Sequence, residues 1–133
     1  RCHGPGERHA AGDVKSIVNP AKLPPRQRDS ICEQCHLTGV ARVERRGKAM
    51  HEFRAGDDWG DFVATFLGSR EKAAATDHAE QLSMSRCKQL AGDKLWCGSC
   101  HDPHDAKPVG SEACRSCHAK AHAGERGDCV KCH

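Results

Sequence analysis

Hydrophobic residues recur at helical spacing most clearly in one short stretch of this chain, residues 59–66. The spacing i, i+3, i+4 and i+7 puts four apolar side chains on one face of an α-helix: Trp59, Phe62, Val63 and Phe66. We therefore expect a helix here, packed through this face against the interior of the protein.

A longer helix is predicted over residues 76–91. Asp77 and Glu80 stand at the spacing of a capping box, which satisfies the first backbone N–H groups of a helix. Gly92 is placed to end the helix, because glycine readily adopts the conformation found just after a helix C-terminus.

The other segments show little periodicity. Residues 13–30 contain three prolines and are expected to form an extended connection. Val40 and Val43 alternate with polar residues too briefly to predict a strand. The chain is therefore expected to be mainly α, with much irregular loop and little or no β-sheet.

Composition limits what can fill the interior. Apolar residues make up 37% of the chain, aromatic residues 4%, and the mean hydropathy is −0.73. Burial of such side chains would hardly offset the conformational entropy lost on folding. The ten cysteines and ten histidines are the remaining candidates for building a core, through a metal or a cofactor.

Two kinds of partner have no support in the sequence. No run approaches the roughly 18 apolar residues of a transmembrane helix. The net charge of +3 is modest and its basic residues are scattered, so nucleic-acid binding is not expected. The sequence contains no signal peptide, and we interpret it as a mature or truncated product.

The cysteines follow a repeat, CxxCH. Four copies are complete: Cys32–Cys35–His36, Cys97–Cys100–His101, Cys114–Cys117–His118 and Cys129–Cys132–His133. The opening residues Arg1-Cys2-His3 match the end of a fifth copy, so the sequence is expected to begin inside a motif, as a fragment would.

This spacing suits covalent attachment of haem. Two cysteines three residues apart can form thioethers to the two vinyl groups, and the following histidine can bind the iron. Zinc bound by paired CxxC units is the main alternative, but it does not require a histidine after each second cysteine. A disulfide framework makes no such demand either. The sequence therefore predicts five c-type haems, with zinc and disulfides as alternatives.

The histidines divide evenly between two expected roles. The proximal iron ligands would be His3, His36, His101, His118 and His133. The five remaining histidines are predicted distal ligands: His9, His51, His78, His104 and His122. Every iron would then have histidine on both faces, unless one or two of these histidines lie at the surface and Met50 or Met84 takes their place.

Close spacing within some motifs suggests how the haems are arranged. His104 follows His101 by three residues, and His122 follows His118 by four. Each pair lies on one side of the backbone, so the second histidine is expected to reach the iron of a neighbouring haem. His9, six residues after His3, is expected to do the same.

These inferences predict a single pentahaem domain over residues 1–133, with three haems crowded into residues 97–133. The closely packed haems would form its core, and the chain would not fold stably without them. Cys87 belongs to no motif. A buried thiol beside a haem, a disulfide to a residue outside this sequence, and a functional thiol are its three interpretations.

The motifs resemble those of multihaem c-type cytochromes with closely packed haems, the group around cytochrome c-554 and the doubled-CxxCH proteins. The resemblance rests on "CHGPGERH" at residues 2–9, on "CHDPH" at 100–104 and on the other CxxCH units, and spans nearly the full chain. Residues 77–104 also look like bacterial multihaem cytochromes that are often fused to helical repeats. The resemblance implies export to the periplasm or the cell surface of a bacterium.

Three functions are compatible with these observations. The first is electron transfer to and from other redox proteins, since full histidine ligation leaves no iron open to a substrate. The second is a subunit of a conductive extracellular filament, in which copies of this chain would be the partners. The third is a multihaem oxidoreductase, which requires at least one open haem.

Overall fold

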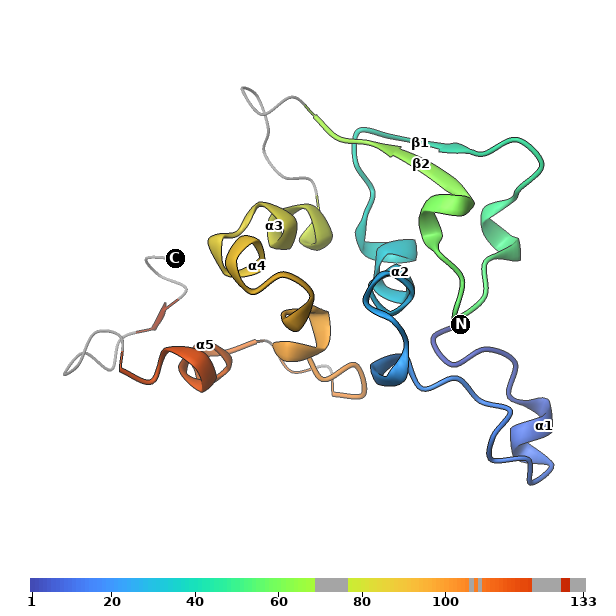
Figure 1. Cartoon of the computed structure of the whole chain (residues 1–133), viewed down its shortest axis with the longest axis horizontal. Coiled ribbons are helices and arrows are strands. Elements are labelled where there is room, and N and C mark those ends of the chain that lie inside the picture. Colours follow the sequence, from blue (N-terminus) through green and yellow to red (C-terminus); the bar gives the residue numbers. More distant parts are fainter. Residues whose placement is uncertain (69–76, 106, 108, 121–127, 130–133) are drawn as a thin grey trace. The chain divides into compact units, whose positions relative to one another are not determined.

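The computed structural model describes residues 1–68, 77–105, 107, 109–120, 128 and 129. The chain divides into two compact units, residues 1–94 and 95–133. The described part is mainly helical with one small sheet, as expected from the sequence (Figure 1). A single domain built around haems remains a prediction.

Short helices dominate the unit of residues 1–94, together with a two-stranded sheet (Figure 1). Its α-helices are α1 (Glu7–Ala10), α2 (Pro25–His36), α3 (His78–Met84) and α4 (Arg86–Ala91). Its 3-10 helices are η1 (Pro20–Lys22), η2 (Met50–Glu52), η3 (Trp59–Asp61) and η4 (Gly92–Lys94), and its strands are β1 (Ala41–Glu44) and β2 (Val63–Phe66). The unit of residues 95–133 contains η5 (Cys97–Ser99) and α5 (Ser111–His118).

Residues 59–66 do not form the predicted helix. Trp59 begins the 3-10 helix η3, and Val63–Phe66 is strand β2, which pairs antiparallel with β1 in the register Ala41↔Phe66 and Glu44↔Val63. Cross-strand hydrogen bonds and β-branched neighbours outweigh a local helical period in so short a segment. Trp59 and Val63 are nevertheless buried, whereas Phe66 is 54% exposed.

Two other expectations need correction. Residues 13–30 are not extended throughout, because Pro20–Lys22 forms η1 and α2 begins at Pro25, where proline presets the first helical φ angle. The Val40–Val43 segment is a strand after all, since Ala41–Glu44 is β1. Asn19 and the prolines decide the first structure from within the segment, whereas pairing with the distant strand β2 decides the second.

The predicted helix at 76–91 exists as two helices, α3 and α4, separated at Ser85. Ser85 is extended (ψ 143°), and its hydroxyl accepts a hydrogen bond from the backbone N–H of Lys88 at 3.1 Å, so it caps the second helix. Asp77 is the N-cap of α3, and Gly92 ends α4 with a φ of 55°. Both predicted ends are confirmed.

A small apolar core lies between α2 and the sheet formed by β1 and β2. Phe53 packs edge-on against Trp59 and Phe62, with ring centroids 5.3 and 5.8 Å apart, and Leu37 covers the cluster. Arg42 reaches over the Trp59 ring at 5.7 Å from its centroid. This core fixes the C-terminal half of α2, where the first complete CxxCH motif lies.

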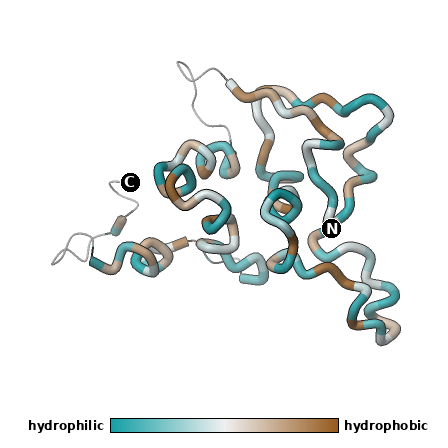
Figure 2. Tube along the Cα trace, viewed as in Figure 1, coloured by the Kyte–Doolittle hydropathy of each residue, from teal (hydrophilic) through white to brown (hydrophobic). Residues whose placement is uncertain are grey.

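Over all the described residues, more large hydrophobic side chains are exposed than buried. The buried ones are Ile31, Phe53, Trp59, Phe62 and Val63. The exposed ones are Val14, Val40, Val43, Met50, Phe66, Leu67, Met84 and Leu90. Hydrophobic positions are correspondingly scattered along the trace rather than gathered in one place (Figure 2). The described polypeptide therefore buries little of its own apolar surface.

Candidate functional site

The motif at residues 32–36 occupies the last turn of α2. Cys32 and Cys35 are three residues apart in the helix, and Cys32 and His36 are four apart, so the two sulfurs and the imidazole share one face. The helix ends at His36. Cys32 is half-buried and Cys35 exposed, which leaves this face accessible to a ligand.

The motif at residues 114–118 has the same arrangement in the other unit. α5 spans Ser111–His118 and also ends at the motif histidine, with Cys114 half-buried and Cys117 exposed. Two segments without sequence similarity outside the motif thus present Cys, Cys and His in the same way. Two of the described motifs thus share one local structure.

The motif at residues 97–101 forms a tighter turn. Cys97–Ser99 is the 3-10 helix η5, and the backbone N–H of His101 donates to the carbonyl of Cys97 at 2.9 Å. The Trp96 ring lies directly against the α-carbon of Gly98, so close that any side chain at position 98 would collide with it. Gly98 therefore allows an aromatic ring to pack on the motif.

His104 follows this turn in the irregular segment before α5. Its Nδ1 lies 3.5 Å from Oδ1 of Asp102, and its backbone N–H donates to the same oxygen at 2.9 Å. Asp102 therefore orients the side of the ring that carries Nδ1. Metal-binding histidines commonly have such a carboxylate behind the ring.

His3 has a defined tautomer. Its Nδ1 lies 2.8 Å from the backbone carbonyl of Val18. Because a carbonyl can only accept, Nδ1 must carry the proton, and in a neutral ring Nε2 then holds the lone pair. This tautomer is the one required for an Nε2 metal ligand.

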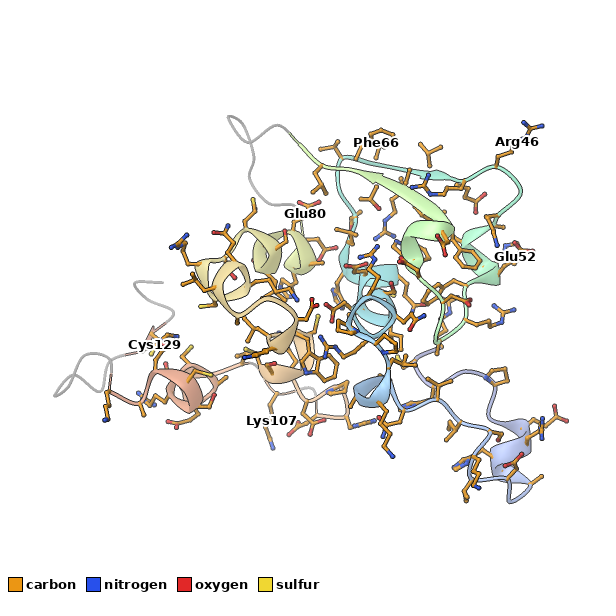
Figure 3. The ribbon with its side chains drawn as sticks, viewed as in Figure 1. Arg46, Glu52, Phe66, Glu80, Lys107 and Cys129 are labelled. Atoms are coloured by element: carbon orange, nitrogen blue, oxygen red, sulfur yellow. The ribbon has the colours of Figure 1, made fainter. Side chains whose placement is uncertain are left out.

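Other predicted site residues also lie in the described part, and Cys2, directly before His3, is exposed. His9 is exposed in α1, and His51 is exposed in η2. Cys129 lies beside the start of α5, where its backbone N–H donates to the hydroxyl of Ser111 at 2.9 Å. Figure 3 labels this cysteine. His122, Cys132 and His133 lie outside the described residues.

The most informative contact joins α2 to α3. The imidazoles of His36 and His78, distant in sequence, have centroids 5.8 Å apart and planes within 13° of parallel. The His36 Nδ1 lies 3.7 Å from Oδ1 of Asp77, the N-cap of α3. A predicted proximal ligand and a predicted distal ligand are thus brought together.

Asp77 is held by three groups around it. Its carboxylate accepts hydrogen bonds from the Thr38 hydroxyl at 2.5 Å and from the backbone N–H of His78 at 2.7 Å. The Thr38 bond lowers the pKa of Asp77 below its usual value, against the opposing effect of burial, and the His78 N–H and both imidazoles act in the same direction. Asp77 therefore stays ionised beside His36.

Glu33, inside the motif, is part of the support for α2. Arg26 donates to Glu33 at 3.0 Å and to Asp58 at 3.0 Å, tying the helix to the segment before η3. Burial raises the pKa of the Glu33 carboxyl, and the Arg26 charge only partly opposes this. The Arg26 side chain thus links the motif residue Glu33 to the N-cap of η3.

Haem, zinc and disulfides each need a different arrangement of cysteine and histidine side chains. Among the nine described cysteines no disulfide forms, and within the same residues no three metal-binding side chains gather as a zinc site would need. The Cys–Cys–His faces of α2 and α5 fit a haem held by two thioethers and one imidazole. These two faces could hold a haem, which stays a prediction.

Sequence reasoning missed the groups that orient the imidazoles. The Val18 carbonyl behind His3 left no signal in the sequence. Asp77 was recognised only as a helix cap, and Thr38 was not recognised at all. Arg42 and Arg45 donate to the backbone carbonyls of Leu37 and Gly60, so each has a structural role within the unit.

Comparison with known proteins gives no relative: no protein-family profile, curated protein or solved structure matches this chain. Among the described residues, no helix is long and apolar enough to cross a membrane.

Proposed function

We propose that this protein transfers electrons through about five covalently bound c-type haems, each iron ligated by two histidines. The observation that carries the proposal is the repeated presentation of Cys, Cys and His on one face at the end of α2 and again at the end of α5. Covalent haem attachment accounts for this, because it needs two cysteines and one histidine on the same side of each helix.

The sparse core supports the same proposal. The described chain leaves more large hydrophobic side chains exposed than buried. Flat apolar macrocycles bound at several points would cover such side chains and supply the missing interior. The protein would then be a small, mainly α multihaem cytochrome whose packed haems form its core.

The residues divide into two roles. The motif cysteines would anchor the groups: Cys2, Cys32, Cys35, Cys97, Cys100, Cys114, Cys117, Cys129 and Cys132. The ten histidines would provide both axial positions, excluding substrate from the iron. When bound, a c-type haem supplies reversible one-electron exchange between ferric and ferrous iron. The chain sets the spacing, the ligands and the surrounding charge.

Partners of the proposed cytochrome are other redox proteins or copies of itself. One face of the two-stranded sheet favours an interaction with a protein, because Val43 and Phe66 are each 54% exposed on it. Figure 3 shows Phe66 at the outer side of the two-stranded sheet. We place the protein in the periplasm or at the cell surface of a bacterium, and a conductive filament is the alternative assembly.

The test is a haem count and an electron paramagnetic resonance spectrum of the oxidised full chain, produced in a bacterium that matures c-type cytochromes. About five haems per chain, all low-spin, would support the proposal. One high-spin iron per chain would favour an oxidoreductase with an open haem. A chain that carries zinc or no cofactor would refute the proposal.

A further inference from the structure

Strand β2 has one edge that faces no other strand. Among the described residues the sheet consists of β1 and β2, so each strand pairs along one side. β2 packs mainly against β1 and the preceding η3. An unpaired edge presents a row of backbone N–H and C=O groups, and these can pair with another strand.

The register shows which backbone groups of β2 lie on that edge. The N–H of Arg45 donates to the carbonyl of Phe62 at 2.8 Å, and these two residues continue the register of β1 with β2 by one pair. Hydrogen-bonded and non-bonded pairs alternate along antiparallel strands. The backbone groups of Val63 and Thr65 therefore point away from β1, toward the free edge.

The two strands differ in how their free edges are protected. β1 contains Arg42 and Glu44 and is followed by two more arginines, the second of which, Arg46, lies beyond the end of the strand (Figure 3). Charged side chains on an edge strand discourage further pairing. Residues 62–67, with the sequence FVATFL, contain no charge and no proline. Short uncharged segments of this kind add strands readily, so β2 is the unprotected edge.

A second copy of this chain matches this edge in charge and in side-chain size. Two β2 strands paired antiparallel about a two-fold axis at Thr65 bring their outward-facing backbone groups opposite each other. In this register Ala64 lies beside Phe66 of the second copy, so a small side chain meets a large one. Val63 lies beside Leu67 of the second copy, and no like charges meet. Phe66 and Leu67 are each 54% exposed and therefore accessible for these contacts.

The small size of the contact limits its strength. A strand of four residues with its immediate neighbours covers much less than the roughly 800 Å² per partner of a stable protein interface. We therefore expect a weak dimer, with a dissociation constant on the order of 0.1 mM.

We propose that two copies of this chain pair through the free edges of their β2 strands and form one continuous four-stranded sheet. No motif cysteine or histidine lies on β2, so this pairing goes beyond the proposed haem ligation and does not depend on it. A two-fold contact closes on itself, so it produces dimers rather than an open filament.

The test is sedimentation equilibrium of the full chain at concentrations below and above about 0.1 mM. The wild-type chain should show a balance of monomer and dimer that shifts with concentration. Thr65→Pro removes an N–H group on the free edge and leaves the hydrogen bonds to β1 in place. It should weaken the dimer about tenfold or more, because a two-fold contact contains the lost hydrogen bond twice.

Val43→Lys is the matched control for Phe66→Lys. Val43 and Phe66 are equally exposed on the same face of the sheet, but Val43 lies on β1, away from the paired edge. Phe66→Lys should weaken the dimer, and Val43→Lys should leave it unchanged. An equal loss in both variants would show that the copies meet face to face and would overturn edge pairing. A wild-type chain that stays monomeric, or a folded Thr65→Pro chain that dimerises like the wild type, would overturn it as well.

Hydrogen exchange of the wild-type chain provides a second measurement if Thr65→Pro does not fold. The N–H groups of residues 63–67 should exchange more slowly at concentrations where the dimer forms than at high dilution, because pairing protects the free edge. Those of β1 should exchange at the same rate under both conditions. Exchange of residues 63–67 that does not change with concentration would contradict the proposed pairing.

Discussion

The hydroxyl of Ser30 connects α2 to the backbone of Trp59. It accepts a hydrogen bond from the Trp59 N–H at 2.9 Å and donates one to the carbonyl of Arg26 at 2.8 Å. Ser30 is fully buried. A single polar side chain thereby fixes the helix that carries Cys32, Cys35 and His36 against the apolar core.

Ser30→Ala should lower the stability of the unit of residues 1–94 by about 1–3 kcal/mol, because a buried N–H loses its acceptor. Thermal unfolding followed by circular dichroism measures this change. Ser116→Ala is the control, since Ser116 makes a similar bond to the Ala113 carbonyl but is exposed. Equal effects of the two substitutions would contradict the role given to Ser30.

Gly39→Ala should be more damaging than Gly47→Ala. Both glycines have positive φ angles, 61° and 74°, so alanine brings a similar backbone strain of about 1–2 kcal/mol at each. At position 39 the new methyl group would also approach the Thr65 side chain to 2.7 Å and press on the Phe66 carbonyl, whereas position 47 is open. We expect an additional loss of about 1–3 kcal/mol for Gly39→Ala.

Denaturant titration of the two alanine variants measures that difference. Gly39 directly follows Thr38, which holds Asp77, so Gly39→Ala should also weaken the packing of α2 against α3. Indistinguishable midpoints for the two variants would show that the contact with β2 does not restrict this turn.

The sequence predicted elements whose signals are local. Asp77 and Gly92 marked the ends of the α3–α4 segment, and the structure confirms both. The helix expected at Trp59–Phe66 was wrong, because four residues of that segment pair with β1, a partner that a periodicity analysis does not see. Interactions between distant segments therefore decided the outcome where local patterns were short.

The same limit applies to the candidate site. The CxxCH spacing identified the cysteines and the histidine that follows them, because all the groups stand on one helical turn. The contact of His36 with His78 depends on how α2 meets α3, and no spacing rule predicts it. The Val18 carbonyl behind His3 was equally invisible, since every residue carries a carbonyl.

Removing one motif should remove one haem. Cys114→Ser/Cys117→Ser eliminates both thioether positions on α5, so the denatured chain should lose the mass of a single haem. Cys87→Ser is the control, because Cys87 lies in α4 outside any motif and its loss should leave the haem count unchanged. Mass spectrometry under denaturing conditions distinguishes the two, and a wild-type mass equal to the bare polypeptide would contradict covalent attachment.

Asp77→Asn should raise the reduction potential of one haem. The carboxylate near Nδ1 of His36, at 3.7 Å, would stabilise the ferric state by its negative charge. Asparagine caps a helix as well as aspartate does, so α3 should remain folded. We expect a rise on the order of tens of millivolts. For a one-electron couple, a tenfold change in the equilibrium constant between the ferric and ferrous states corresponds to about 59 mV.

Potentiometric titration followed by absorption measures this shift, and Asp102→Asn provides the matched comparison. Asp102 lies 3.5 Å from Nδ1 of His104 in the other unit, so its substitution should move a different redox transition in the same direction. If Asp77→Asn left every potential unchanged while Asp102→Asn moved one, His36 would not be an iron ligand supported by Asp77.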